Sequence, residues 1–469
     1  GAAGTKRVPT WVWLPLVWLS TVLIQASVYA VRPMVSYQAL RLDAGPLGVG
    51  VIASMFAVLS LGLAIPAGRW VDQRGEAPFM VGGALLVALA AAATTLAPNV
   101  VALAASQAVL GVGHLFSVVA SQTLMANSVA GEARDNRIGM FTVMVSLGQL
   151  VGPLFAGQVV ARAAGGGAAV GAAGLAGGGA GGGAAVGVAG GGAVGGVAGV
   201  AGGASAAGLG QVFVASGLLA GVGLLCLVPL WVGSRRRLRE GVAAPAQGDE
   251  GGQREESVGR GSEGQAGGGG RAGSDVLTIL RHPGMPVAMF ASVIVLTTID
   301  LLVAYLPVYG EERGISVAFV TLLLSVRAGF SMASRLGMPM LLHWLGRGRL
   351  LFGSAVVAGL AVTALPLWGV PWVEVALMAL AGLGLGLGQP LTMSWVASIA
   401  PRRLRGLALG VRLSGNRLGQ LVVPGLYGAL AGVAGVTTIF WASGALLLLA
   451  GGFSLQAPLE AGNGESVAG

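Results

Sequence analysis

The sequence of 469 residues has few charged side chains, three histidines and one cysteine. Asp, Glu, Lys and Arg make up 10% of the chain, whereas a soluble domain has about 25%. This shortage of charge excludes a water-soluble fold, because a surface in contact with water needs more charged groups. The single cysteine, Cys226, cannot form an intrachain disulfide, and we assign it to helix packing.

The residue patterns of enzymes are also missing. The three histidines, His114, His282 and His343, are scattered along the chain, and neither HExxH nor GxSxG occurs. A membrane enzyme would need a nucleophile or a cluster of metal ligands. We therefore expect no catalytic activity, no cofactor and no metal site.

Long apolar runs dominate the chain, which is 55% hydrophobic and has a mean hydropathy of +0.81. A helix needs roughly 20 apolar residues to cross a bilayer. The runs predict twelve transmembrane helices at 11–40, 47–71, 79–96, 100–125, 138–160, 212–232, 285–309, 317–344, 350–368, 372–399, 404–430 and 433–455. We expect the first helix to be retained rather than cleaved as a signal peptide, because it is long and rich in tryptophan.

Basic residues are distributed unevenly between the two sides of these predicted helices. Of the 27 Lys and Arg residues, 19 lie on the side of the N-terminus, five lie inside spans, and only Arg41, Arg162 and Arg313 lie on the opposite side. Because basic loops stay in the cytoplasm, both termini are predicted to be cytoplasmic. The net charge of +9 reflects this orientation, so we do not expect the chain to bind nucleic acid.

The two halves of the chain resemble each other at a constant offset, which we call the repeat offset. It aligns GQLVGPLFAG (148–157) with GQLVVPGLYG (419–428), and it also aligns Gly75, Gly111 and Gly113 with Gly346, Gly382 and Gly384. After the fifth predicted span a smaller offset fits best and aligns FVASG (213–217) with FWASG (440–444). The difference between the two offsets places a 44-residue insertion in the first half. The sequence thus predicts two six-helix halves, 1–233 and 282–469.

Two regions of low complexity lie outside this repeat. The insertion falls within 163–210, a tract of Gly, Ala and Val that we expect to form a flexible loop on the outer side. Two short extra spans are the alternative. Residues 234–281 have little to bury and are predicted to form a disordered cytoplasmic linker, whose arginine cluster attracts anionic membrane lipids.

A short motif after the second predicted span carries a family resemblance. Gly68, Asp72, Arg74 and Gly75 resemble the GxxxDRxG loop of the major facilitator superfamily. The resemblance covers nearly the whole chain apart from the insertion and the linker. It implies an all-α polytopic membrane fold and a latch, in which Gly68 permits close helix approach and Asp72 contacts the start of the eleventh span, at 404–407.

The fifth predicted span contains a second motif, similar to the glycine and proline pattern of drug:proton antiporters in that superfamily. Its residues are Gly139, Gly148, Gly152, Pro153 and Gly157. Small residues at this spacing permit tight helix packing, and Pro153 permits a bend. The antiporter pattern also has an arginine where this chain has Gln107. A packing face with no bearing on the direction of transport is the alternative interpretation.

Polar side chains inside the spans are the candidate site residues. A charge within the membrane costs at least about 2.5 kcal/mol, so such residues face a cavity or a partner. The candidates for a substrate cavity are Gln25, Tyr29, Arg32, Arg327, Arg412, Asn416, Arg417 and Gln420, and those for proton coupling are Asp300 and His114. Packing is the alternative for His114, and anchoring to helix ends is the alternative for Arg335 and Arg412.

The resemblance also places the first and seventh spans opposite each other across a central cavity, which predicts an ion pair between Arg32 and Asp300. Taken together, these features predict a monomeric secondary transporter of the cytoplasmic membrane, with proton-coupled export of a small organic solute favoured. Five arginines against one aspartate inside the spans also fit an organic anion. Uptake or export of such an anion or of a sugar-like solute, and a non-transporting sensor or scaffold, are the alternatives.

Overall fold

The structure, a computed structural model, describes residues 10–128, 132–164, 205–239, 277–282, 284–400 and 405–456. Every regular element within these ranges is helical. The long helices are α1 (Thr10–Arg41), α2 (Pro46–Arg74), α3 (Glu76–Thr95), α4 (Val100–Asn127), α5 (Glu132–Ala163), α7 (Ala206–Arg239), α9 (Met285–Glu312), α10 (Val317–Trp368), α11 (Pro371–Ile399), α12 (Arg405–Ala434) and α13 (Thr437–Gln456).

All twelve predicted spans correspond to these helices. Ten of the described helices are long and apolar enough to cross a membrane. One of them, α10, contains the eighth and ninth predicted spans, because the chain turns within it at Gly346. The eleventh predicted span lies in α12. The predicted all-α fold is confirmed, and the chain is a multi-pass membrane protein.

The predicted insertion within 163–210 and the predicted linker at 234–281 lie largely outside the described residues. The structure describes the end of α5 at Ala163, the start of α7 at Ala206 and the end of α7 at Arg239. The boundaries of the two halves, the outer loop and the linker therefore stay predictions.

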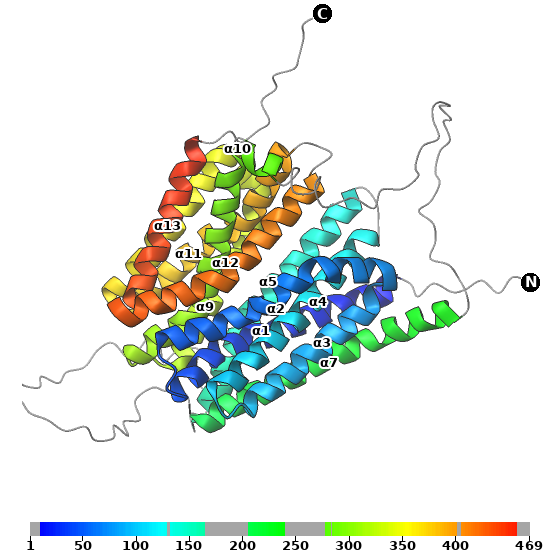
Figure 1. Cartoon of the computed structure of the whole chain (residues 1–469), viewed down its shortest axis with the longest axis horizontal. Coiled ribbons are helices and arrows are strands. Elements are labelled where there is room, and N and C mark those ends of the chain that lie inside the picture. Colours follow the sequence, from blue (N-terminus) through cyan, green and yellow to red (C-terminus); the bar gives the residue numbers. More distant parts are fainter. Residues whose placement is uncertain are drawn as a thin grey trace, which may run out of the picture.

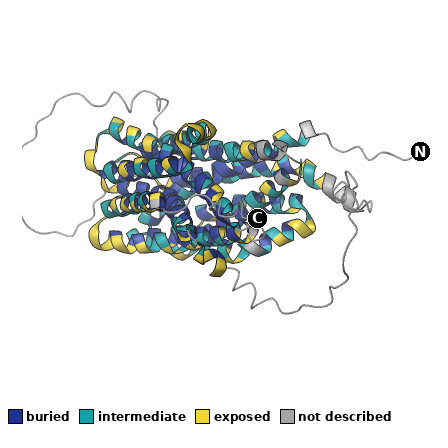
Figure 2. Cartoon of the chain, turned by 90° about the horizontal axis from the view of Figure 1, so that it is seen from above, coloured by how far each residue is buried: buried dark blue, intermediate teal, exposed yellow. Residues whose placement is uncertain are grey.

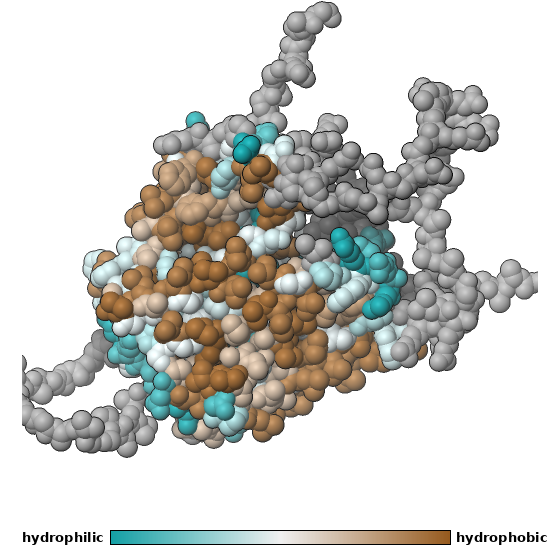
Figure 3. All heavy atoms as spheres, in the orientation of Figure 1, coloured by the Kyte–Doolittle hydropathy of each residue, from teal (hydrophilic) through white to brown (hydrophobic). Residues whose placement is uncertain are grey.

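The helices form two bundles, which follow each other along the chain. In Figure 1 the first half runs from dark blue to green and the second half from light green to red. Buried residues run through the middle of the assembly in Figure 2, and exposed residues lie mostly on its outer surfaces. Figure 3 shows a broad hydrophobic band between hydrophilic ends. This distribution is typical of helices that contact lipid around their middle.

Aligned glycines occupy equivalent places in the two bundles, as the sequence repeat predicts. A Cβ atom at Gly111 would collide with the carbonyl oxygen of Phe56, and a Cβ atom at Gly382 would collide with that of Arg327. Phe56 and Arg327 are themselves aligned by the repeat offset. The two halves therefore repeat the same close helix contact, with different side chains beside it.

A second equivalence concerns the turns between helices. Gly75, between α2 and α3, has a φ of 83°, and its counterpart Gly346, within α10, has a φ of 71°. Only glycine adopts such a conformation without strain. Gly75 is the last residue of the GxxxDRxG-like motif, so its presence in the motif has a direct conformational reason.

The two bundles meet tightly at one end of the molecule, which we call the closed end. The hydroxyl of Tyr305 on α9 donates to the carbonyl oxygens of Pro46 (3.2 Å) and Pro424 (2.8 Å), which belong to α2 and α12. Gly50 and Gly428 lie beside this junction, where a side chain on either would collide with the opposite half. Tyr305 thus connects helices of both halves at the closed end.

Toward the opposite end, which we call the open end, the halves separate. A Cβ atom at Gly68, Gly139 or Gly410 would meet no other described residue within 4 Å. Figure 1 shows the two groups of helices diverging in this direction, toward the upper right of the view. The structure is thus closed at one end and open at the other.

Candidate functional site

The candidate residues gather where the two bundles face each other. Arg32 Nη1 on α1 donates to Asp300 Oδ1 on α9 at 2.7 Å, so the ion pair predicted from the sequence is present. Both side chains are more than nine-tenths buried, with 9% and 6% exposed. The Arg32 guanidinium also lies over the ring of Phe56, 4.5 Å from its centroid. One ion pair therefore links the first half to the second.

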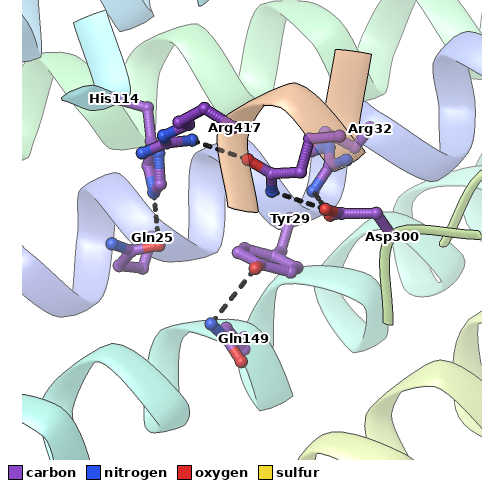
Figure 4. Close-up of polar contacts among 8 residues, drawn as sticks. Gln25, Tyr29, Arg32, His114, Gln149, Asp300 and Arg417 are labelled. Carbon is purple, nitrogen blue, oxygen red and sulfur yellow. Dashed lines mark hydrogen bonds and ion pairs between the residues drawn. The ribbon is translucent and has the colours of Figure 1, made fainter. Parts of the chain in front are cut away.

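Asp300 has a further partner on α12. Gln420 Nε2 donates to Asp300 Oδ2 at 2.5 Å, and Arg417 Nη1 donates to Gln420 Oε1 at 2.9 Å. Figure 4 shows these contacts as a continuous chain from Arg32 to Arg417. Each oxygen of the Asp300 carboxylate thus bonds to a different helix. This series of contacts contains two positive charges and one negative charge.

Two hydrogen bonds within the first half lie beside this series of contacts. Gln149 Nε2 donates to the hydroxyl oxygen of Tyr29 at 3.1 Å. His114 Nε2 lies 3.2 Å from Gln25 Oε1. Figure 4 shows both contacts close to Arg32 and Asp300. The candidates for proton coupling and several cavity candidates therefore belong to one cluster, which we call the central polar cluster.

Arg412 and Asn416 lie on the same helix as Gln420, but their contacts tie the second half together. Arg412 Nη2 donates to the carbonyl and side-chain oxygens of Gln389 (3.1 and 2.8 Å) and to Thr392 Oγ1 (3.1 Å). Asn416 Oδ1 accepts from Ser292 Oγ at 3.0 Å. These bonds join α12 to α11 and α9. They agree with an anchoring role for Arg412, and a substrate role for either residue stays a prediction.

Arg335 is anchored in a similar way, but across the two halves. Its Nε donates to the carbonyl oxygen of Gly386 at 3.1 Å, and its Nη1 donates to Ser146 Oγ on α5 at 2.8 Å. Ser146 and Gln149 were not predicted as site residues. The repeat contained the signal for Gln149, because the repeat offset aligns it with Gln420.

A small cavity opens beside Arg32 and faces the closed end. Its lining includes Arg32, Ser36, Phe56, Gln107 and Val303, and its volume of about 20 Å³ is enough for one water molecule. Gln107 Nε2 is buried and has no hydrogen-bond partner among the described residues. The side chain that replaces the arginine of the antiporter pattern therefore lies next to the ion pair.

The latch predicted for Asp72 stays a prediction. Asp72 is exposed at the end of α2, and the segment expected to receive it begins at residue 404, outside the described residues. The close helix approach at Gly68 stays a prediction as well: a Cβ atom there would meet no described residue within 4 Å, and the segment expected to approach it begins outside the described residues.

The antiporter-like motif packs largely as predicted. Side chains at Gly148 or Gly152 would collide with α1, and one at Gly157 would collide with Thr321 at the start of α10. Gly139 is exposed, and a Cβ atom there would meet no described residue within 4 Å, so its tight packing stays a prediction. Pro153 lies within α5, between the packed glycines. The motif therefore fixes α5 against both halves.

Comparisons with known proteins agree with this architecture. The family model described as Major Facilitator Superfamily matches residues 17–177 and 345–464, more than half of the chain. A search of curated proteins found no match.

Solved structures of transporters have the same fold. A nucleoside transporter is 12% identical with a TM-score of 0.65, covering 95% of this chain and 99% of that one. A bacterial homologue of the human lysosomal transporter Spinster, inward-facing and occupied, is 13% identical with a TM-score of 0.62, covering 96% and 97%. A D-xylose-proton symporter is 14% identical with a TM-score of 0.61, covering 94% and 97%. At such identities the likeness concerns the fold alone, but with the family match the conclusion is direct: the chain belongs to the major facilitator superfamily of transporters.

Proposed function

We propose that this transporter couples the movement of a small organic solute to the movement of protons, with Asp300 as the proton carrier. The observation that carries the proposal is the position of the Asp300 carboxylate, which binds Arg32 of the first half and Gln420 of the second. Alternating access requires the halves to rearrange around a central site. A carboxylate that bridges them gains or loses stabilising partners as they move, which changes its tendency to bind a proton.

The direction that we propose is export. In the orientation predicted from the basic residues, the open end faces the cytoplasm and the closed end faces outward. The Tyr305 junction closes the outer side, so solute enters the cluster from the cytoplasm. The resemblance of the fifth span to drug:proton antiporters favours the same direction.

The proposed cycle begins from the state described above, with Asp300 ionised and bound to Arg32. Solute enters from the open end, the closed end opens, and the solute leaves on the outer side. A proton from the outer side then neutralises Asp300 and releases Arg32 from the ion pair. Return to the cytoplasm-open state delivers the proton to the cytoplasm and restores the pair. Separation of the pair is thus the step that links the two fluxes.

An Asp300→Asn variant tests the proposal in liposomes. A thermal-shift screen of the purified protein first identifies a transported solute. We expect the variant to lose transport driven by a pH gradient and to retain exchange of that solute down its own gradient. Glu311→Gln, which neutralises an exposed carboxylate at the end of the same helix, is the matched control and should keep both activities.

Two outcomes would contradict the proposal. Full transport driven by the pH gradient in Asp300→Asn would exclude Asp300 as the coupling site, and loss of both activities in a folded variant would assign it to solute binding instead. Wild-type liposomes that move neither solute nor ions would favour the non-transporting sensor or scaffold.

A further inference from the structure

Arg327 on α10 is a buried arginine for which no described residue is a partner. Its side chain is 2% exposed. Within the described ranges its guanidinium makes no hydrogen bond and no ion pair, and its Nε atom is fully buried and unsatisfied. A guanidinium has five N–H donors and remains charged at any physiological pH. A buried charge of this kind is normally paired, because its hydration has been lost.

The other arginines of the spans make the contrast clear. Arg32 has the Asp300 carboxylate, Arg335 has a carbonyl and a hydroxyl oxygen, and Arg412 has three oxygen partners. Arg417 has Gln420, although its Nε is also buried and unsatisfied. Arg327 is thus the arginine for which the protein supplies no oxygen atom in its described residues.

The surroundings of Arg327 add to this excess of positive charge. Arg327 lies within electrostatic range of Tyr29, Asp300, Arg32 and Arg335 in the central polar cluster. Asp300 is already shared by Arg32 and Gln420. Among the described residues of this cluster a single carboxylate therefore faces several guanidinium groups, so the cluster has an excess of positive charge.

The backbone at Arg327 is held in place. Gly382 on α11 packs so closely that a Cβ atom there would collide with the Arg327 carbonyl oxygen. The equivalent close contact in the first half has Phe56 in place of the arginine. The scaffold does not require a charged residue at this place, because the same backbone contact forms beside an aromatic one.

We infer that Arg327 binds the carboxylate of a small organic anion, which is the solute of this transporter. The inference rests on the proposed transport function and names the substrate class of the same site. The planar guanidinium can donate two parallel N–H···O bonds to a carboxylate, which fixes its orientation.

The first test measures binding without any gradient. The purified full-length protein is heated in detergent with acetate, benzoate or succinate, and with the neutral amides acetamide, benzamide and succinamide. We expect at least one carboxylate to raise the melting temperature by about 2 °C or more, and its amide to leave it unchanged. The shift should disappear in Arg327→Gln and remain in Arg347→Gln, a variant of an arginine that lies outside the cluster.

A second measurement needs no ligand. In anion-poor buffer, Arg327→Gln should melt at the same temperature as the wild type or higher, because the variant removes an uncompensated buried charge. Arg412→Gln should melt at a lower temperature, because it breaks three hydrogen bonds. A fall in melting temperature for Arg327→Gln as large as that for Arg412→Gln would show a structural role and overturn the inference.

Two further outcomes decide between explanations. Equal shifts with carboxylates and amides, or no shift with any carboxylate, would also overturn the inference. Because binding is measured in detergent, it is independent of proton coupling. A carboxylate shift that is lost in Arg327→Gln, together with liposome transport that ignores the pH gradient, would remove the coupling proposal and leave the substrate class standing.

Discussion

The two halves of the molecule make the same hydrogen bond in the central polar cluster, but to different acceptors. In the first half Gln149 donates to the phenol of Tyr29 at 3.1 Å, and in the second half Gln420 donates to the carboxylate of Asp300 at 2.5 Å. The repeat offset relates both glutamines and both acceptors. An unperturbed phenol keeps its proton at neutral pH, whereas a carboxylate exchanges one far more readily. The repeat thus preserves the geometry and changes the chemistry.

The pair formed by Phe56 and Arg327 follows the same rule. Both residues accept close contact from an aligned glycine, Gly111 or Gly382, at their backbone carbonyl. The first half has an aromatic ring there, over which Arg32 stacks, and the second half has a guanidinium without a hydrogen-bond partner among the described residues. The comparison indicates that the second half contributes the carboxylate and the buried guanidinium at these aligned positions, while the first half has a phenol and an aromatic ring there.

We expect the largest effect on transport from the motif between the second and third spans, which is preserved in the first half alone. Asp72 aligns with His343 and Gly68 aligns with Pro339, so the motif is degenerate in the second half. We predict that Asp72→Asn lowers the transport rate at least about 10-fold, since a charged hydrogen bond at a helix N-terminus contributes roughly 1.5–3 kcal/mol. His343→Asn should transport at close to the wild-type rate, because no latch is expected there.

Initial rates in liposomes, corrected for the amount of folded protein, provide the measurement. Both side chains are exposed, so neither substitution should prevent folding. Equal rates for Asp72→Asn and the wild type would remove the basis for a latch. Equal losses in the two variants would show that the two halves contribute alike.

Substitution of the two aligned glutamines, Gln149 and Gln420, should have effects of intermediate size. Gln420→Leu removes the hydrogen bond to Asp300 Oδ2 and leaves Arg32 as the partner of the carboxylate. We predict that transport driven by a pH gradient falls about 5-fold, the equivalent of roughly 1 kcal/mol for one hydrogen bond. Gln149→Leu removes a bond to the phenol of Tyr29 and should have a smaller effect on this rate. Equal losses in both variants would argue against Asp300 as the proton carrier.

The sequence predicted those features of the central polar cluster that follow from the cost of burying charge. Arg32 and Asp300 were expected to pair because charges within a membrane are costly and because the resemblance to the superfamily places their spans opposite each other. The lack of a partner at Arg327 could not be predicted, because it depends on which oxygen atoms neighbouring helices bring within reach. The close approach at Gly68 stays a prediction, because the segment expected to meet it begins at residue 404, outside the described residues.

The smallest effect is expected from the region in which the halves differ most in length. The second half joins α12 to α13 through a short connection between Ala434 and Thr437. The first half is predicted to have the 44-residue insertion at the equivalent place, within 163–210. Its composition is almost wholly Gly, Ala and Val, which gives weak helix propensity and no charged group that could bind a solute.

We therefore predict that deletion of this insertion leaves the transport rate and its pH midpoint unchanged. A short connection is sufficient because the second half joins the equivalent helices without the insertion, and loop length has only a slow effect on the free energy of closure. Transfer of the same segment to the connection between α12 and α13 is the reciprocal variant, and it should be tolerated for the same reason. Loss of transport in the deletion at normal membrane levels would show that the first half needs the insertion, and the equivalence of the two connections would then be wrong.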